Sequence, residues 1–170
     1  WHALGRKVAW RGKREHEAHK MNLSEHFTLR EFTRSQTAER CGIDNSPDSD
    51  QMICLKKIAA EILEPIRVTF DVPFAPSSGF RCEELNDRIG GSRTSQHCKG
   101  EAVDIELPGV SNLELARWCQ DNLNFDQLIL ECWDGRPDSG WVHISKAEDN
   151  RLEVLTYQRG VGYSVGLPKE

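Results

Sequence analysis

The stretch SQHCKGEAVD at residues 95–104 places a histidine and a carboxylate seven positions apart. Neither an α-helix nor a single strand brings positions with this spacing side by side. A turn that carries His97, a bend at Gly100 and a strand that returns Asp104 would bring them together. The segment WVHIS adds His143 on the polar side of an alternating pattern. Two nitrogen donors and one oxygen donor suit a catalytic zinc site that keeps one position open for water.

Each of these residues also has a simpler interpretation when it is taken alone. A single histidine more often makes an ordinary hydrogen bond, and a single aspartate on a strand is usually solvated. The spacing therefore leaves two alternatives open, a metal site and three unrelated polar residues. At a metal site, zinc would lower the pKa of its bound water to roughly 7 and provide hydroxide at neutral pH.

Apolar periodicity predicts the elements that would hold these residues. Strict alternation predicts strands, with the aliphatic side chains of AVDIEL and WVHIS on one face and Asp104 and His143 on the other. Further strands are predicted over FAPSSGFR, FDQLILE and LEVLTYQ, the last of which is the final strand expected.

Helices are predicted mainly in the first half of the chain. A capping box of Thr28 and Glu31 predicts a short helix from about residue 29. A longer helix is predicted with Pro47 in its first turn, and it is expected to end or kink at Pro65. CEELNDRIGG reads as a short helix, and Ser111 caps another that runs to about Asn122. Helices first and strands later indicate an α+β fold, with an antiparallel sheet flanked by helices.

Length and charge exclude some classes of protein. A chain of 170 residues suits one domain with a single core. The net charge of −5 argues against a nucleic-acid binder, and no apolar run approaches the roughly 18 residues of a membrane span. Residues 1–20 carry a net charge of +4 and lack the apolar centre of a secretory signal. We interpret 1–20 as a basic, disordered extension and 21–165 as one domain, expected to be monomeric; a basic arm that binds an anionic polymer is the alternative.

The six cysteines form no C-x-x-C pair. A core of this size needs no covalent cross-links, so reduced thiols are favoured over three disulfides. Cys98 is adjacent to His97 and therefore points away from it in most backbone conformations.

Several ordered motifs resemble one known family. Ser95-x-His97-x-x-Gly100-x-Ala102-x-Asp104 is similar to the first ligand motif of the zinc D-Ala-D-Ala carboxypeptidases, whose superfamily includes phage L-alanyl-D-glutamate endopeptidases and the hedgehog domain. Trp141-x-His143 resembles the strand of the third ligand. SGFR at 78–81, the LN…GG segment at 85–91 and LSEHFTLREF near the start extend the resemblance over about 22–158, closest to the phage and prophage branch.

The resemblance implies a role for each matching residue. His97, Asp104 and His143 would bind one zinc ion. Arg81 would hold a substrate carboxylate through its planar guanidinium, although a surface salt bridge is the simpler interpretation. Ser95 would contact substrate or only shape the turn, and Trp141 would line the substrate site.

One position departs from the family. Many members carry the general base three residues before the last histidine, where this chain has Gly140. Hedgehog-type members carry a glutamate at the end of the preceding strand, and Glu131 occupies that position here. We therefore expect Glu131 to be the general base. Asp134 and Asp138, in the loop that follows, are weaker candidates.

The resemblance implies a zinc peptidase that cuts the peptide stem of peptidoglycan, as a carboxypeptidase or an endopeptidase. A phage or prophage origin and action on the bacterial cell wall are expected with it. The alternative is a zinc-binding recognition module or phage structural module without catalysis, which the missing base at Gly140 favours and the presence of Glu131 and Arg81 opposes.

Overall fold

The computed structural model describes residues 21–169, so the basic segment 1–20 and its expected role lie outside the described residues. Helical and strand segments follow one another along the chain as the α+β prediction requires. They are α2 (Leu29–Thr33), α3 (Gln36–Cys41), α4 (Ser49–Ile58), η1 (Ala59–Leu63), α5 (Glu64–Phe70), α6 (Glu83–Arg88), η2 (Gln96–Lys99), β1 (Ala102–Ile105), α7 (Asn112–Asn122), β2 (Gln127–Glu131), β3 (Trp141–Ser145), β4 (Glu153–Gln158) and β5 (Gly162–Val165).

The predicted helix starts are confirmed by their capping bonds. At α2, the backbone N–H of Thr28 donates to Glu31 Oε2 over 2.7 Å. At α7, Ser111 Oγ accepts from the backbone N–H of Glu114 over 3.1 Å. Both bonds satisfy groups that the first turn of a helix leaves without an internal partner. The six-residue helix α3 was not predicted, although Ser35 caps it by accepting from the backbone N–H of Ala38 over 3.3 Å.

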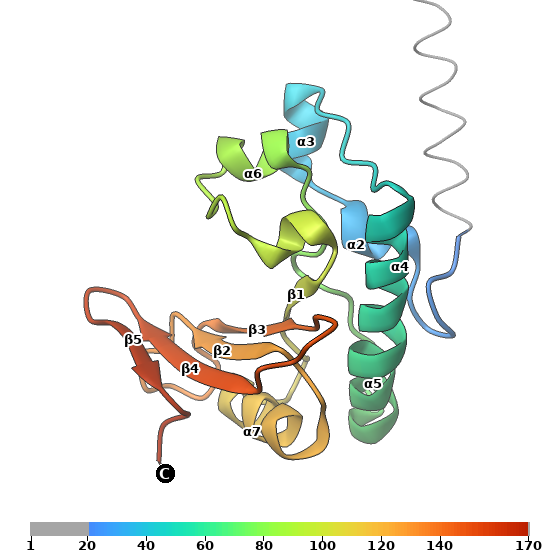
Figure 1. Ribbon diagram of the computed structural model, residues 1–170. Helices are drawn as coiled ribbons and strands as arrows, with labels where there is room; N and C mark the ends of the chain where they lie inside the picture. The colour runs from blue at the N-terminus through green and yellow to red at the C-terminus, as the bar shows by residue number, and fades with distance from the viewer. Residues whose placement is uncertain (1–20, 170) are drawn as a thin grey trace, which may run out of the picture.

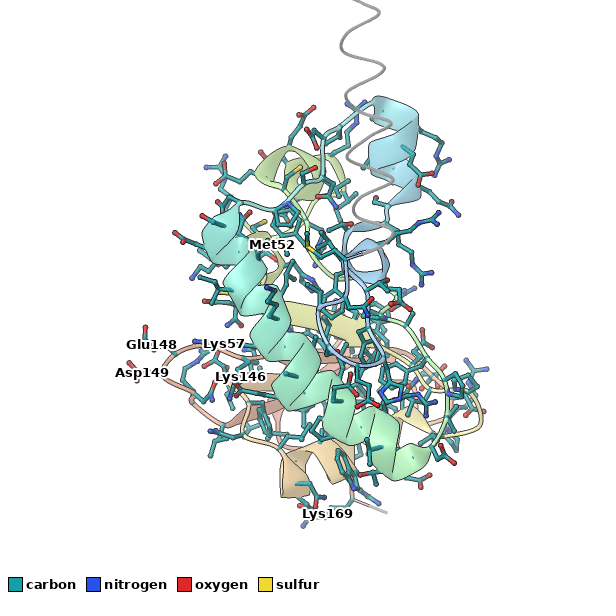
Figure 2. The ribbon with its side chains drawn as sticks, turned by 90° about the vertical axis from the view of Figure 1, so that its right-hand side faces the viewer. Met52, Lys57, Lys146, Glu148, Asp149 and Lys169 are labelled. Atoms are coloured by element: carbon teal, nitrogen blue, oxygen red, sulfur yellow. The ribbon has the colours of Figure 1, made fainter. Side chains whose placement is uncertain are left out.

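The helix after Pro47 does not end at Pro65. The π-helical turn η1 precedes the proline, and α5 continues from it to Phe70. Proline has no N–H and crowds the carbonyl four residues back, and a wider turn relieves both problems. Figure 2 shows α4, η1 and α5 as one long helix, which Lys146 contacts from the end of β3 through a 3.0 Å ion pair with Glu61.

The five strands form one sheet in the order β1-β3-β2-β4-β5. Three of the pairings are antiparallel, but β2 and β4 are parallel, which corrects the prediction of an antiparallel sheet. The cause is topological. Both edges of β3 are already occupied by β1 and β2, so the chain that leaves β3 reverses and pairs at the free edge of β2.

The two faces of the sheet have different surroundings. On one face of β1, β2 and β3, the side chains of Val103, Leu128, Val142 and Ile144 are fully buried in the main core. Figure 1 shows α7 against one face of the sheet, the long helix beside it, α3 and α6 at the other end of the molecule, and α2 next to α4. The opposite face carries the polar residues Asp104 and His143, and it is the face on which the site forms.

Two segments differ from their predicted structure. FAPSSGFR is not a regular strand, because only Ser78 bridges to β1, opposite Asp104. The edge strand β5 was missed, since it is only four residues long and its side chains are mostly exposed. No helix among residues 21–169 is both long and apolar enough to cross a membrane. All six cysteines are free thiols.

Candidate metal centre

Three separate segments bring the predicted ligands together. His97 lies on the 3-10 turn η2, Asp104 on β1 and His143 on β3. Asp104 and His143 are directly opposite each other in the β1–β3 register. One candidate ligand atom from each residue lies within 4.8 Å of the other two. The structure therefore contains the turn, the bend and the returning strand that were inferred from the sequence.

The orientation of His97 leaves one ring nitrogen available. His97 is buried, and its Nδ1 is 2.7 Å from the carbonyl oxygen of Gly79. A carbonyl oxygen only accepts, so Nδ1 carries the proton and donates. In the neutral ring, Nε2 then presents a lone pair, and it lies 3.4 Å from Asp104 Oδ1. Burial lowers the pKa of His97 and outweighs the opposing effect of Asp104, which favours this neutral form.

Asp104 stays ionised between the two histidines. Its Oδ1 is 2.8 Å from His143 Nδ1. Burial by itself would raise the pKa of Asp104, but the hydrogen bond with His143 and the proximity of both imidazole rings together outweigh it and hold that pKa well below its usual range. The cluster therefore offers one carboxylate and two imidazoles, all turned toward the same point.

The SGFR segment fixes the backbone of both ends of the cluster. The backbone N–H of Asp104 donates to the Ser78 carbonyl over 2.8 Å, and that of Arg81 donates to the His97 carbonyl over 3.2 Å. Between them, Gly79 packs so closely on α2 that an added Cβ would lie 2.5 Å from the carbonyl oxygen of Phe32. Only glycine fits this position, where its carbonyl also orients His97.

This donor set fits zinc. Two imidazole nitrogens and one carboxylate oxygen are typical of a catalytic zinc site, whereas structural sites use four protein ligands, mostly cysteine. Cys98 is not part of the cluster.

Glu131 lies on the same face of the sheet as His143. In the β2–β3 register, Ile129 is opposite His143 and Glu131 is opposite Trp141, so Glu131 and Ile129 share the face of the site. Burial raises the pKa of Glu131; His143 opposes this rise, and the charge of Asp104 adds to it. A carboxyl group with a raised pKa is suited to taking up and releasing a proton.

Gly140 has a structural explanation. Its φ is +70°, and an added Cβ would lie only 1.7 Å from the carbonyl oxygen of Glu131. Asn112 holds this turn by donating its side-chain amide to the Gly140 carbonyl over 3.0 Å. No side chain fits at 140, so a base at that position is incompatible with the path of this backbone.

All seven predicted site residues line one cavity of about 580 Å³: Arg81, Ser95, His97, Asp104, Glu131, Trp141 and His143. Arg81 Nε is buried and has no hydrogen-bond partner within residues 21–169. Burial lowers the pKa of Arg81, yet a guanidinium stays protonated at physiological pH. The side chain of Ser95 makes no capping bond to η2 and faces the cavity instead.

The weaker candidates for the base lie elsewhere. Asp134 and Asp138 line an adjoining cavity of about 550 Å³, which shares Trp141 with the metal cavity. Asp134 is half-exposed and pairs with Arg136. Neither aspartate is among the residues that line the metal cavity.

A sequence model of the family Peptidase M15 matches residues 25–145, well over half of the chain. The chain belongs to the Peptidase M15 family. M15 peptidases are zinc-dependent metallopeptidases, and the cluster of His97, Asp104 and His143 can hold one metal ion. A search of curated proteins gave no match to the chain.

Two further residues of the M15 site were not anticipated from the sequence. Gly79 was noted only as part of SGFR, and its carbonyl bond to His97 depends on contacts between distant segments. Tyr163 lines the metal cavity from β5 and was missed with that strand. Its ring contacts Tyr157, with 4.8 Å between the ring centroids.

Proposed function

We propose that this M15 metallopeptidase hydrolyses peptide bonds in the stem peptide of peptidoglycan and acts on the bacterial cell wall. The observation that carries the proposal is the placement of Arg81. A buried guanidinium nitrogen that has no hydrogen-bond partner among the described residues, 21–169, lies in the same cavity as the metal cluster and Glu131. Stem peptides carry free carboxylates at the D-glutamyl residue and at the C-terminal D-alanine, and a planar guanidinium binds a carboxylate through two parallel hydrogen bonds.

Each residue of the cavity would have a distinct task. When bound, zinc supplies Lewis-acid activation of water and of a carbonyl group at neutral pH. Glu131 takes a proton from the attacking water at its carboxylate and passes it to the nitrogen of the leaving amine. Arg81 binds the substrate carboxylate and so sets which peptide bond reaches Glu131. Ser95 and Trp141 line the path of the peptide.

Mass spectrometry of purified muropeptides tests the proposal. The zinc-loaded protein is incubated with muropeptides, with and without a chelator. Loss of a terminal alanine would indicate a carboxypeptidase, and a cut between L-Ala and D-Glu an endopeptidase; either product must disappear with chelator. Intact muropeptides after incubation with folded, zinc-loaded protein would contradict the proposal and favour a recognition module without catalysis.

Two variants test the assignment of the base. Glu131→Gln should retain zinc and lower the rate by roughly 10²–10⁴-fold, because the amide cannot accept the proton. Asp138→Asn, in the adjoining loop, should cleave at the rate of the unmodified protein. A loss of rate in Asp138→Asn with normal rates in Glu131→Gln would move the base to the loop.

A further inference from the structure

A second buried carboxylate lies next to the metal site but outside it. Asp126 precedes β2 and is only 2% exposed. Its two oxygens accept four hydrogen bonds. Oδ1 accepts from the backbone N–H and Nε of Arg151, over 3.1 and 2.8 Å. Oδ2 accepts from the terminal guanidinium nitrogen of Arg151 over 2.7 Å and from Gln96 Nε2 over 2.9 Å.

These bonds join segments that are far apart in the sequence. Gln96 opens the η2 turn and directly precedes His97, whereas Arg151 lies in the loop between β3 and β4. The backbone of Asp126 also bonds on both sides, donating to the Ser145 carbonyl over 2.8 Å and accepting from the Glu153 N–H over 3.0 Å. Asp126 is therefore held rigidly at the junction of three strands, and Gln96 is attached to it.

The η2 turn is held differently on its other side. There the SGFR segment bonds to the carbonyl and to Nδ1 of His97, and Gln51 of α4 donates to the Cys98 carbonyl over 3.0 Å. Those contacts hold the turn to α4 and to the SGFR segment, which itself bonds to Phe32 of α2 and to Asp104 of β1. The bond from Gln96 to Asp126 adds a link on the opposite side of the turn, to the junction of β2, β3 and β4.

The charges of this network are matched. Arg151 directs Nε and one terminal nitrogen to Asp126, and its other terminal nitrogen lies 3.3 Å from Glu153. Although Arg151 lines the metal cavity, its donors face carboxylates, unlike the buried Nε of Arg81. The network is suited to holding position, because a buried charge with all its hydrogen bonds made resists displacement.

We propose that Asp126 and Gln96 are positioning residues for the metal: the bond between them fixes the rotation of the η2 turn and so aims His97 Nε2 at Asp104 and His143. This inference rests on the metal site of the proposed function and is independent of which bond the enzyme cuts. Groups that orient metal ligands typically contribute about 10–100-fold to metal affinity. Gln96 acts one residue away from the ligand, so we expect the lower end of that range.

The test measures metal binding and not turnover. The zinc dissociation constant is determined for the full chain by competition with a chromophoric chelator, and the visible spectrum of the cobalt-substituted protein reports the ligand geometry. Gln96→Ala should weaken zinc binding by about tenfold and change the cobalt spectrum. Gln96→Glu places a second carboxylate against that of Asp126, and the repulsion between them should weaken zinc binding further. The double variant Gln96→Glu/Asp126→Asn exchanges donor and acceptor and should recover part of the loss.

A matched control separates positioning from general stability. Glu153→Gln removes the outer contact of Arg151 and leaves the bond between Gln96 and Asp126 in place. Its zinc dissociation constant should stay within about twofold of the unmodified protein. Equal zinc affinity and an unchanged cobalt spectrum in Gln96→Ala would overturn the inference, and so would an equal loss in Glu153→Gln. Neither result would bear on muropeptide cleavage, which is measured separately.

Discussion

Replacing Gly140 by alanine is expected to disturb the fold and Glu131 together. The residue has a φ of +70°, in the left-handed region, and its missing side chain faces the backbone of the strand that carries Glu131. The added Cβ would lie 1.7 Å from the Glu131 carbonyl oxygen, 2.9 Å from its carbonyl carbon and 3.0 Å from that of Cys132. These are backbone atoms, so no side-chain rotation relieves the overlap. The end of β2 must move instead.

Two contributions set the magnitude. Placing a residue other than glycine in the left-handed region costs about 1–2 kcal/mol. Forcing packed atoms apart typically costs about 1–3 kcal/mol more. We therefore expect Gly140→Ala to lower the free energy of unfolding by roughly 2–5 kcal/mol. For a chain of this size each kcal/mol shifts the melting temperature by about 2–4 °C, so the midpoint should fall by roughly 4–20 °C.

Thermal unfolding of the metal-free protein measures this effect, and Gly109→Ala is the matched control. Gly109 has a similar φ of +77°, but no atom lies within 4 Å of its added Cβ. The control should lose only the conformational part, about 1–2 kcal/mol. Equal melting temperatures for the two variants would refute the argument from steric overlap.

Gly140→Glu, which restores the family's usual base position, should not rescue the activity of Glu131→Gln.

Three further predictions concern single side chains. Asp104→Asn should weaken zinc binding by more than about 100-fold, because the carboxylate ligand is lost; titration with a competing chelator would detect it, and unchanged affinity would mean that Asp104 is no ligand. Arg81→Lys should raise KM about tenfold with little change in kcat, because an ammonium cannot form the paired bonds; unchanged steady-state kinetics on muropeptides would remove its role. Arg151 lowers the pKa of Asp126 to about 2, below its value in the unfolded chain. This contributes roughly 2 kcal/mol to stability above about pH 4, which is lost as the pH falls toward 2. Denaturant unfolding should show this loss in the unmodified protein, and the same acid dependence in Asp126→Asn would exclude Asp126 as its source.

Local sequence patterns were enough to predict most of the elements that carry the site. The capping bonds of Thr28 and Ser111 lie within single turns, and the alternation of AVDIEL and WVHIS reflects one buried and one polar face. The likeness to known ligand motifs then joined His97, Asp104 and His143, which spacing alone left undecided. The structure brings those three residues together.

What the sequence did not reveal depends on contacts between distant segments. The parallel pairing of β2 and β4 follows from which strand edges are already occupied, and no local pattern records that. The role of Gly140 depends on how close the backbone of Glu131 approaches it. In the Asp126 network, Arg151 is 25 positions and Gln96 is 30 positions from Asp126 in the sequence. No local pattern connects residues so far apart.

The metal site is divided between near and far parts of the chain. His97 and Asp104 are seven residues apart, but His143 is 39 residues beyond Asp104 and reaches it only when β1 and β3 pair. An unfolded chain therefore cannot offer all three ligands at once, and zinc binds the folded chain in strong preference to the unfolded one. Such selective binding adds about 4 kcal/mol to stability when free zinc exceeds its dissociation constant 1,000-fold. Zinc supply thus sets how long each molecule survives proteolysis and heat, as well as how many molecules are competent for hydrolysis.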